Sequence, residues 1–444
     1  MELMNTDLLA FTKDLPLNTK SVYKQDAKLA SAIDKLCSSN QAKLFDASGL
    51  KLLPERKIEF SEVQELLKGS VKKESTIKPS HEILKETNDA RKSLIKRIED
   101  VLGNINKSAE SGETPKLVIR NQKLWSNCIY DLDRVTLKSF NEAKKTMLCY
   151  SNSEDKTRFN TIVFVLTKVH ELLSKNLTVT RRELFYQNVV RLRNQANLDV
   201  AVRDVCCLLE TPPWSLGIVA TAKGLIAGPL TLHHRDGSAL DCMSAGGVLI
   251  PQDIIGIKEF KSTAKYILVV EKDAIFQKLL DEGALVRLGP VIIITGKGYP
   301  DVCTRQLLCR LCTELRLQAL ALVDGDPHGY EIFLTYKYGS LAQSHLSSSL
   351  ACTSLLLLGA RYSDVMTLSS KEARLPLTEL DKRKLRNLMK RPYLETPIGL
   401  RIKEELSVML SSGTKAEIEA LAPTAAALCD AYLPAKIIQN DYLG

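Results

Sequence analysis

The stretch ILVVEKD, at residues 267–273, places a run of aliphatic residues directly before a carboxylate. LVDGDPHG, at residues 322–329, repeats this pattern, and a third apolar run occupies 291–294 between them. Helical stretches at 274–280 and 301–317 separate the three runs. Short buried strands that alternate with helices indicate an α/β fold with a parallel sheet.

Acidic residues follow two of these predicted strands. Glu271 ends the first strand, and Asp324 and Asp326 come just after the third. In open α/β sheets, ligands bind outside the carboxyl ends of the strands, so neighbouring strands would bring the three carboxylates to one crevice. Such a set of hard oxygen ligands suits Mg²⁺ bound together with a phosphate. Acidic residues also end strands simply because turns are polar, so the prediction depends on the trio and its context.

The loop TGKGYPD, at residues 295–301, follows the second predicted strand and puts Lys297 on the same edge, where it can meet a phosphate. It lacks the four-residue spacer and the Ser/Thr of a P-loop, which disfavours nucleotide hydrolysis. His328 follows the acidic pair, and three roles stay open for it: orienting Asp326, contacting DNA, or packing. Cys309 and Cys312 lack a second pair at metal spacing, so zinc is not favoured.

Upstream, residues 158–227 indicate three helices followed by strands. The first helix is expected at 159–174. The second runs from a capping box at Thr180 and Glu183 to residue 192, and the third from a cap at Asn197 to the prolines at 212 and 213. Strands are expected at 215–221, 229–234 and 238–243, with a turn at 235–237. Helices before a β-hairpin is the order of a winged helix-turn-helix, which lays a helix in the DNA major groove.

Tyr186 is the candidate nucleophile of this region. It lies in RRELFY, residues 181–186, near the start of a predicted helix and beside two arginines. A tyrosine hydroxyl has a pKa of about 10 and needs a neighbouring cation to act as a nucleophile. Arg182 is one such cation. The alternative is that Tyr186 only packs, as most helical aromatic residues do.

The composition agrees with a multi-domain globular protein. The chain has 444 residues, 45% hydrophobic and 25% charged, and its net charge of +9 permits a polyanionic partner. Eleven cysteines without a framework pattern, and an N-terminus without a signal peptide, predict an intracellular protein with reduced thiols. Apolar runs are all shorter than the roughly 18 residues that span a bilayer, so we expect no membrane segment.

The two ends of the chain carry less information. Residues 1–85 are rich in Lys and Ser and contain no chemical motif, so we expect an appended segment that orders on partners and is dispensable for the chemistry. Residues 91–105 predict a helix, and 107–116 a polar loop. Residues 378–421 are helical and charged, and their basic run at 382–391 fits a solvated face, a DNA contact or a nuclear signal equally well.

From about residue 91 to 433 the chain resembles the meiotic double-strand-break transesterases, which are eukaryotic relatives of the cleaving component, the A subunit, of archaeal topoisomerase VI. The segments that carry this resemblance, in order, are VTRRELFYQN (179–188), AKGLIAG (222–228), ILVVEKDAIFQKLLD (267–281), ITGKGYPDVCTRQLL (294–308), LVDGDPHGYEIFLTYKYGS (322–340) and KRPYLE (390–395). Each segment is weak alone, and the ordered set is specific.

The resemblance implies a fold, a division of the chain and a site. It implies a multi-domain α/β protein: an N-terminal extension at 1–85, a CAP-like winged-helix domain that bears the tyrosine at 86–245, and a Toprim domain with C-terminal helices at 246–444. The implied nucleophile is Tyr186, and the implied Mg²⁺ ligands are Glu271, Asp324 and Asp326. Beside them, we expect Arg182 to assist catalysis and Lys223, Lys297 and Arg305 to bind DNA. Two departures stand out: the family often has two adjacent tyrosines where this chain has Phe185 and Tyr186, and often has a basic residue near 212–214.

The implied activity is formation of meiotic DNA double-strand breaks through a 5′-phosphotyrosyl link. The family pairs the tyrosine of one subunit with the metal of the other, so a homodimer on double-stranded DNA is expected, in the nucleus, with meiotic accessory proteins and a topoisomerase VI B-like subunit. The alternatives are the A subunit of a topoisomerase VI that reseals DNA, a Toprim nuclease that uses water, and a catalytically silent DNA-binding scaffold.

Overall fold

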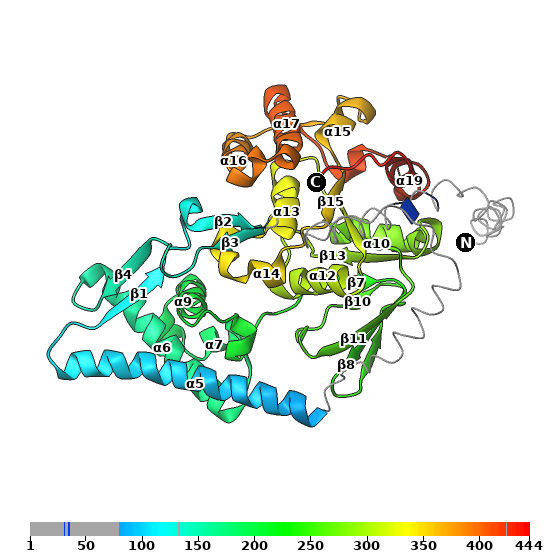
Figure 1. Ribbon diagram of the computed structural model, residues 1–444. Coiled ribbons are helices and arrows are strands. Elements are labelled where there is room, and N and C mark those ends of the chain that lie inside the picture. Colours follow the sequence, from blue (N-terminus) through cyan, green and yellow to red (C-terminus); the bar gives the residue numbers. More distant parts are fainter. Residues whose placement is uncertain (1–30, 32–33, 36–79, 132–133, 423) are drawn as a thin grey trace, which may run out of the picture.

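The computed structural model describes residues 31, 34–35, 80–131, 134–422 and 424–444. The segment 1–85 lies outside the described residues except for a few positions and the start of the first helix, so its role stays a prediction. Figure 1 shows a mainly helical domain and a larger domain built on a central sheet. Within the described residues, no helix combines the length and apolar character that crossing a membrane requires.

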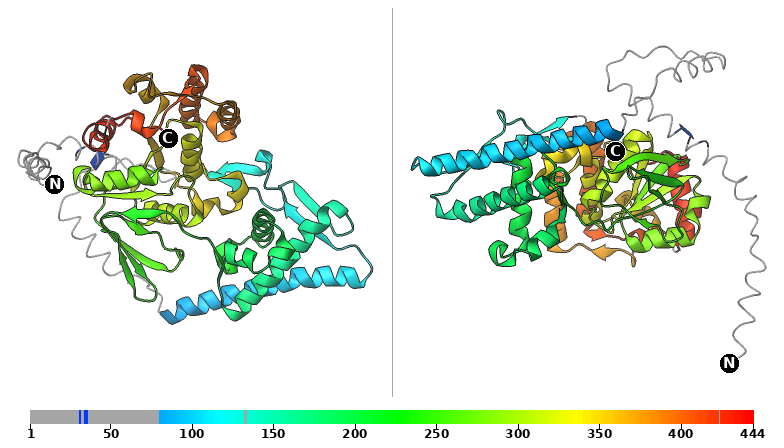
Figure 2. Two further views of the ribbon diagram at one scale, coloured as in Figure 1. Left: turned by 180° about the vertical axis from the view of Figure 1, so that it is seen from behind. Right: turned by 90° about the horizontal axis from the view of Figure 1, so that it is seen from below.

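The first domain is built from helices with short strands at its margin. Its helices are α5 (Ser80–Glu110), α6 (Ser153–Lys175), α7 (Arg181–Tyr186), α8 (Val189–Leu192) and α9 (Gln195–Leu208). Its strands pair as β1 (Lys116–Arg120) with β4 (Lys145–Cys149) and β5 (Val179–Thr180) with β6 (Ile218–Val219). The hairpin of β2 (Cys128–Asp131) and β3 (Arg134–Leu137) packs against the second domain, because Cys128 and Val135 belong to that domain's core. The buried faces of α6 and α9 form the core of the first domain. Helix α5, coloured blue, lies along the outer side of this domain in both views of Figure 2.

The local predictions in this domain are partly confirmed. The capping box is present, with the Glu183 N–H donating to Thr180 Oγ1 over 3.1 Å. The helix that should run to residue 192 breaks between α7 and α8, where the Asn188 side chain donates to the Leu184 carbonyl over 3.0 Å and Asn188 leaves helical geometry. Asn194, rather than Asn197, caps α9. The polar loop expected from residue 107 begins later, because α5 continues to Glu110.

The second domain contains a six-stranded sheet with the order β10-β7-β13-β12-β14-β15. Its strands are β7 (Leu225–Ala227), β10 (Val248–Leu249), β12 (Tyr266–Val270), β13 (Val291–Thr295), β14 (Gln318–Leu322) and β15 (Leu355–Gly359). The last four are parallel and completely buried, which confirms the predicted α/β sheet. Strands β7 and β10 extend it in antiparallel fashion, so the sheet is mixed.

Helices cover this sheet and continue to the C-terminus. They are α10 (Asp273–Asp281), α11 (Ala284–Arg287), α12 (Val302–Glu314), α13 (Pro327–Tyr338), α14 (Ser347–Leu350), α15 (Tyr362–Leu368), α16 (Glu379–Met389), α17 (Pro397–Ser412), α18 (Ala425–Ala427) and α19 (Leu433–Ile438). Figure 1 shows α15, α16 and α17 together at one end of the sheet, beyond α13. Cys309 and Cys312 lie on the buried side of α12, and Cys312 Sγ is 3.4 Å from Cys352 Sγ.

The hairpin that we expected to be the wing packs elsewhere. Strands β8 (Leu230–His234) and β9 (Ala239–Asp241) form a three-stranded sheet with β11 (Ile257–Ser262). Leu230 and Leu232 belong to the same hydrophobic core as the central sheet, not to the core of the helices. The reason is that β7, just before the hairpin, is paired with β13 and ties this segment to the second domain. The prediction of a wing at 229–243 was therefore wrong.

Candidate active site

The strand order brings Glu271 and Asp324 together. Because β12 lies between β13 and β14, the residues that follow β12 and β14 meet at the carboxyl edge of the sheet. Glu271 Oε2 accepts a hydrogen bond from the backbone N–H of Asp324 over 2.9 Å. The two residues are only 8% and 7% exposed. The first two of the predicted carboxylates are thus buried neighbours.

Burial makes negative charge costly at this edge. It raises the pKa of Glu271 to about 8, and the charge of Asp324 adds to this shift. Burial also raises the pKa of Asp324 to about 6, although a hydrogen bond from the Ile418 N–H over 2.9 Å favours its ionised form. When two carboxyl groups are buried side by side, a nearby cation stabilises their ionised forms.

Lys272 supplies a cation that the sequence did not lead us to expect. Its ammonium lies 3.3 Å from Asp324 Oδ1, 3.1 Å from Glu417 Oε2 and 3.0 Å from Glu419 Oε2. Glu417 and Glu419 belong to the C-terminal part of the chain, so the sequence does not indicate that they contact Lys272. The one sequence feature that could have pointed to Lys272 is its position next to Glu271. Among the residues that the structure describes, no three His, Cys, Asp or Glu side chains already form a ligand set for a metal.

Asp326 has a structural role of its own at the same edge. It is the N-cap of α13, and its Oδ1 accepts a hydrogen bond from the Gly329 N–H over 2.6 Å. Its side chain is half-buried. Asp326 therefore follows β14, as the sequence predicts, and one of its carboxylate oxygens caps α13.

The carboxyl edge of the sheet, with Glu271, Asp324 and Asp326, is named the acidic edge. Lys297 and Lys223 lie together beside it. The Lys297 ammonium is 3.0 Å from Asp273 Oδ2, and Lys223 Nζ donates to the Lys297 carbonyl over 3.1 Å. The Gly298 N–H donates to the Glu271 carbonyl over 2.9 Å, which fixes this loop against β12. Both lysines keep enough exposure to meet an anion.

Arg305 does not lie where a DNA contact requires. It is only 3% exposed, on the inner face of α12, and donates to Gln343 Oε1 over 2.6 Å. Burial lowers its pKa to about 10. The prediction of Arg305 as a DNA contact was wrong, because α12 is buried along most of its length, including the side that carries Arg305.

A second polar network joins the 295–301 loop to α13 and α16. The Tyr299 hydroxyl donates to Glu331 Oε2 over 2.6 Å, and it lies 3.1 Å from His328 Nδ1 and 3.0 Å from Lys384 Nζ. Burial raises the pKa of Glu331, but its bonds to Lys384 and Tyr299 and the charge of Arg391 outweigh this and hold the pKa at about 2. His328 thus contacts Tyr299, and two cations of the 382–391 run face Glu331.

Tyr186 has very different surroundings. It is the last residue of α7, 70% exposed, and its ring lies 5.6 Å from that of Phe185. Arg182 is exposed, and within the described part of the chain no hydrogen bond or ion pair joins it to Tyr186. The structure therefore does not bring the predicted cation to the tyrosine hydroxyl.

The tyrosine and the carboxylates belong to different parts of the chain. Leu184 of α7 is buried in the core of the first domain, whereas the strands that precede Glu271 and Asp324 form the core of the second. Figure 1 shows α7 among the helices of the first domain, next to α6 and α9.

Both parts match known protein families. Residues 266–437 match the model of the Toprim domain shared by Spo11 and the A subunit of topoisomerase 6, and residues 157–218 match the model described as "Type IIB DNA topoisomerase". The sheet that bears the carboxylates is therefore a Toprim domain.

Relatives cover most of the chain. The mouse meiotic recombination protein SPO11 is 36% identical over 348 residues, which are 78% of this chain and 87% of the mouse protein. The A subunit of DNA topoisomerase 6 from Arabidopsis thaliana is 34% identical over 357 residues, 79% of this chain and 82% of the plant protein. The meiotic recombination protein W68 of Drosophila melanogaster is 37% identical over 298 residues, 66% of this chain and 87% of the fly protein. The chain belongs to the family that comprises Spo11 and the A subunit of topoisomerase 6.

Proposed function

We propose that this protein forms meiotic DNA double-strand breaks as a topoisomerase-like transesterase. The observation that carries the proposal is the buried pair Glu271 and Asp324 at the carboxyl edge of the Toprim sheet, in a chain that also presents a tyrosine at an exposed helix end. The relatives from mouse and Drosophila are named meiotic recombination proteins, which favours the meiotic role.

The exposure of Tyr186 supports a role as the nucleophile in this proposal. Its phenolate oxygen attacks a backbone phosphorus, a new O–P bond forms, and the bond from phosphorus to the 3′ oxygen breaks. The 3′ oxygen takes up a proton, which balances the one that the tyrosine hydroxyl lost, so the DNA carries a 5′-phosphotyrosyl link and a free 3′ hydroxyl. No water is consumed, so the phosphodiester energy is retained and the step is reversible. Because the ring is mostly exposed, the hydroxyl can reach a bound duplex without unfolding of α7.

The acidic edge fits Mg²⁺ by its donor chemistry. Mg²⁺ usually keeps several waters and binds one or two carboxylates together with substrate phosphates, so a complete protein ligand set is not required. We propose Glu271, Asp324 and Asp326 as its ligands, with Lys272 pairing with Asp324 until the ion binds. The bound ion would stabilise negative charge on the phosphate oxygens. Lys297 and Lys223 would position the same phosphate backbone.

The separation of tyrosine and carboxylates supports a homodimer, in which Tyr186 of one protomer reaches the acidic edge of its partner. We propose that the helices α6 to α9 form a DNA-binding, CAP-like helical module, without a wing from the hairpin at 229–243. Helix α9 and the β1–β4 pair pack on α6 and surround the core of this part. The duplex, meiotic accessory proteins and a topoisomerase VI B-like subunit are the proposed partners, and the nucleus is the proposed location.

The decisive test is to isolate the protein from meiotic cells and ask whether it carries short DNA attached through tyrosine. Covalent 5′ complexes that accumulate in these cells would support break formation. A role in a topoisomerase 6, which one plant relative's name favours, would instead give relaxed and resealed DNA with a B subunit. Breaks with free 5′ phosphates and no attached protein would contradict the transesterase and support a Toprim nuclease.

A further inference from the structure

A cavity of about 270 Å³ lies in the first domain, and its lining includes neither Tyr186 nor the carboxylates of the Toprim sheet. It is formed where β1 ends, between α6 and α9, and Ala342 of the second domain closes one side. Small-molecule pockets usually have volumes of roughly 300–1,000 Å³, so this cavity suits a small group. The cavity lies where the two domains meet, and it is separate from both Tyr186 and the acidic edge.

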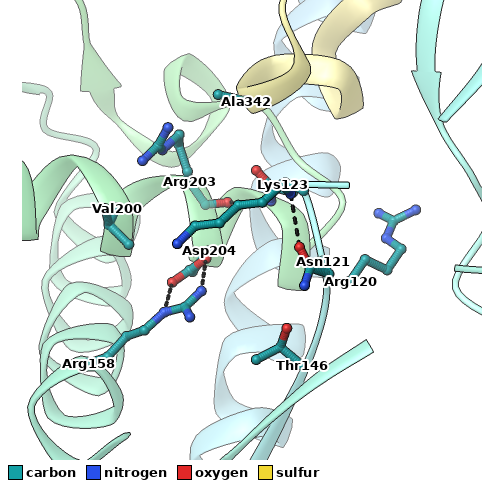
Figure 3. A pocket seen from close by; sticks show the side chains of 10 residues that line it. Arg120, Asn121, Lys123, Thr146, Arg158, Val200, Arg203, Asp204 and Ala342 are labelled. Atoms are coloured by element: carbon teal, nitrogen blue, oxygen red, sulfur yellow. Dashed lines mark hydrogen bonds and ion pairs between the residues drawn. The ribbon is translucent and has the colours of Figure 1, made fainter. Parts of the chain in front are cut away.

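The lining is rich in positive charge, and one pair within it is already neutral. Arg158 donates to both oxygens of Asp204, over 2.8 Å and 2.9 Å, as Figure 3 shows. This bidentate bond raises the pKa of Arg158. Among the described residues that line the cavity, Asp204 is the only carboxylate, so its charge is used by Arg158 and does not compensate the remaining cations.

Three other cations line the cavity: Arg120, Lys123 and Arg203. In Figure 3 the guanidinium of Arg120 turns aside from the others, and it lies 3.0 Å from Glu210 Oε1. For Lys123 and Arg203, the described part of the chain shows no ion pair. Two positive charges are therefore left uncompensated beside the Arg158–Asp204 pair.

His345 lies close enough to Arg120 and Arg203 for their charges to act on it. It is largely enclosed, and neither ring nitrogen has a hydrogen-bond partner within the described residues. Burial lowers its pKa to about 4, and the charges of Arg120 and Arg203 contribute to the shift.

A phosphate group matches these features better than a carboxylate does. A phosphate monoester carries about −1.5 to −2 charges at pH 7, which corresponds to the two uncompensated cations. An arginine offers a planar fork of donors that fits phosphate oxygens, and a lysine adds a compact point charge. We propose that this cavity binds a phosphate group between Arg203 and Lys123, with the Arg158–Asp204 pair as its fixed wall.

The phosphate can come from a free phosphate-bearing small molecule or from a DNA backbone. The inference does not depend on the proposed function, because it uses neither Tyr186 nor the acidic edge. The cavity lies against both domains, so its occupant would also connect β1 and α9 to the segment around Ala342.

The test is a titration of the full-length protein with inorganic phosphate at constant ionic strength, followed by calorimetry. We expect saturable binding, and we expect Arg203→Gln to weaken it about tenfold or more, as loss of a charge-assisted hydrogen bond does. Lys123→Gln should act in the same direction. The matched control is Lys116→Gln, which removes an exposed cation at the far end of the same strand as Arg120 and should leave binding unchanged.

A second arm distinguishes the two sources of phosphate. If the group belongs to DNA, Arg203→Gln should reduce the slope of log affinity for a duplex against log salt by about one unit, and Lys116→Gln should not. If it is a free molecule, the slope stays the same while phosphate binding is lost. Absence of saturable phosphate binding by the unmodified protein, or equal binding by the Arg203 and Lys116 variants, overturns the inference. Equal melting temperatures of the two variants exclude misfolding as the cause.

Discussion

The end of helix α7 and the carboxyl edge of the Toprim sheet are built in opposite ways. Tyr186 is 70% exposed and its ring lies beside that of Phe185, whereas Glu271 is 8% exposed and accepts a hydrogen bond from the Asp324 N–H. The acidic edge is held by residues from three distant segments, including the contacts of Lys272 with Glu417 and Glu419. The difference indicates that the acidic edge is assembled within one chain, and it agrees with our proposal that the tyrosine obtains its chemical environment from DNA and a second protomer.

The largest effect is expected from Tyr186→Phe. It removes the hydroxyl that we propose as the nucleophile, so covalent attachment to DNA should be lost completely, whereas an exposed substitution of this kind changes the free energy of unfolding by no more than about 0.5 kcal/mol. Covalent complexes are measured by denaturing gels and stability by thermal unfolding. Tyr150→Phe, at another exposed tyrosine of the same domain, is the control. Normal levels of covalent complex in the Tyr186 variant would eliminate it as the nucleophile.

At the acidic edge, Glu271→Gln and, separately, Asp324→Asn should weaken Mg²⁺ binding about tenfold or more, since each removes a charged oxygen ligand. The fold should survive Glu271→Gln, because the amide oxygen can still accept the hydrogen bond from the Asp324 N–H. Calorimetry with Mg²⁺ measures the effect, and Glu113→Gln, at an exposed glutamate of the first domain, is the control. Unchanged Mg²⁺ affinity in both variants would remove these residues from the metal site.

The sequence predicted the parts of this site that depend on short segments. Apolar runs before Glu271 and Asp324 indicated two strands, and parallel pairing then placed both carboxylates at one edge. It could not predict Lys272 binding Glu417 and Glu419, because these residues are about 145 positions apart and their approach depends on how the C-terminal helices return. Arg305 was misplaced for a similar reason, since its burial depends on packing against the segment of Gln343.

The hairpin at 229–243 shows that the sequence also could not predict to which domain a segment belongs. Its alternating apolar residues correctly indicated strands, and Leu230 and Leu232 are buried on one face. The same alternation fits packing on helices or on a sheet, so the pattern could not choose between the two domains. The pairing of β7 with β13 decided it, and this pairing is a contact between segments about 66 residues apart.

The contacts of Lys272 allow a test of whether a cation stabilises the acidic edge before Mg²⁺ binds. Lys272→Gln removes the ammonium from Asp324 and two glutamates, and we expect the free energy of unfolding to fall by about 1–2 kcal/mol without Mg²⁺, as for other lost charged hydrogen bonds. Added Mg²⁺ should recover part of this loss, because it replaces the missing positive charge. Thermal unfolding with and without the ion measures both effects. Lys278→Gln, at an exposed lysine of α10, should show neither, and equal behaviour of the two variants would mean that Lys272 does not support the site.

The smallest effect is expected beside the acidic edge, at Lys297. Its ammonium is paired with Asp273 but partly exposed, so it can exchange this partner for a DNA phosphate. If it does, Lys297→Ala should reduce the slope of log affinity against log salt by roughly one unit, because one fewer condensed counterion is released. Lys258→Ala, at an exposed lysine of β11, controls for the loss of one net charge. A slope equal to that of the unmodified protein would assign Lys297 to the Asp273 ion pair alone, and the acidic edge would then depend on Lys223 or on the second protomer to position the DNA backbone.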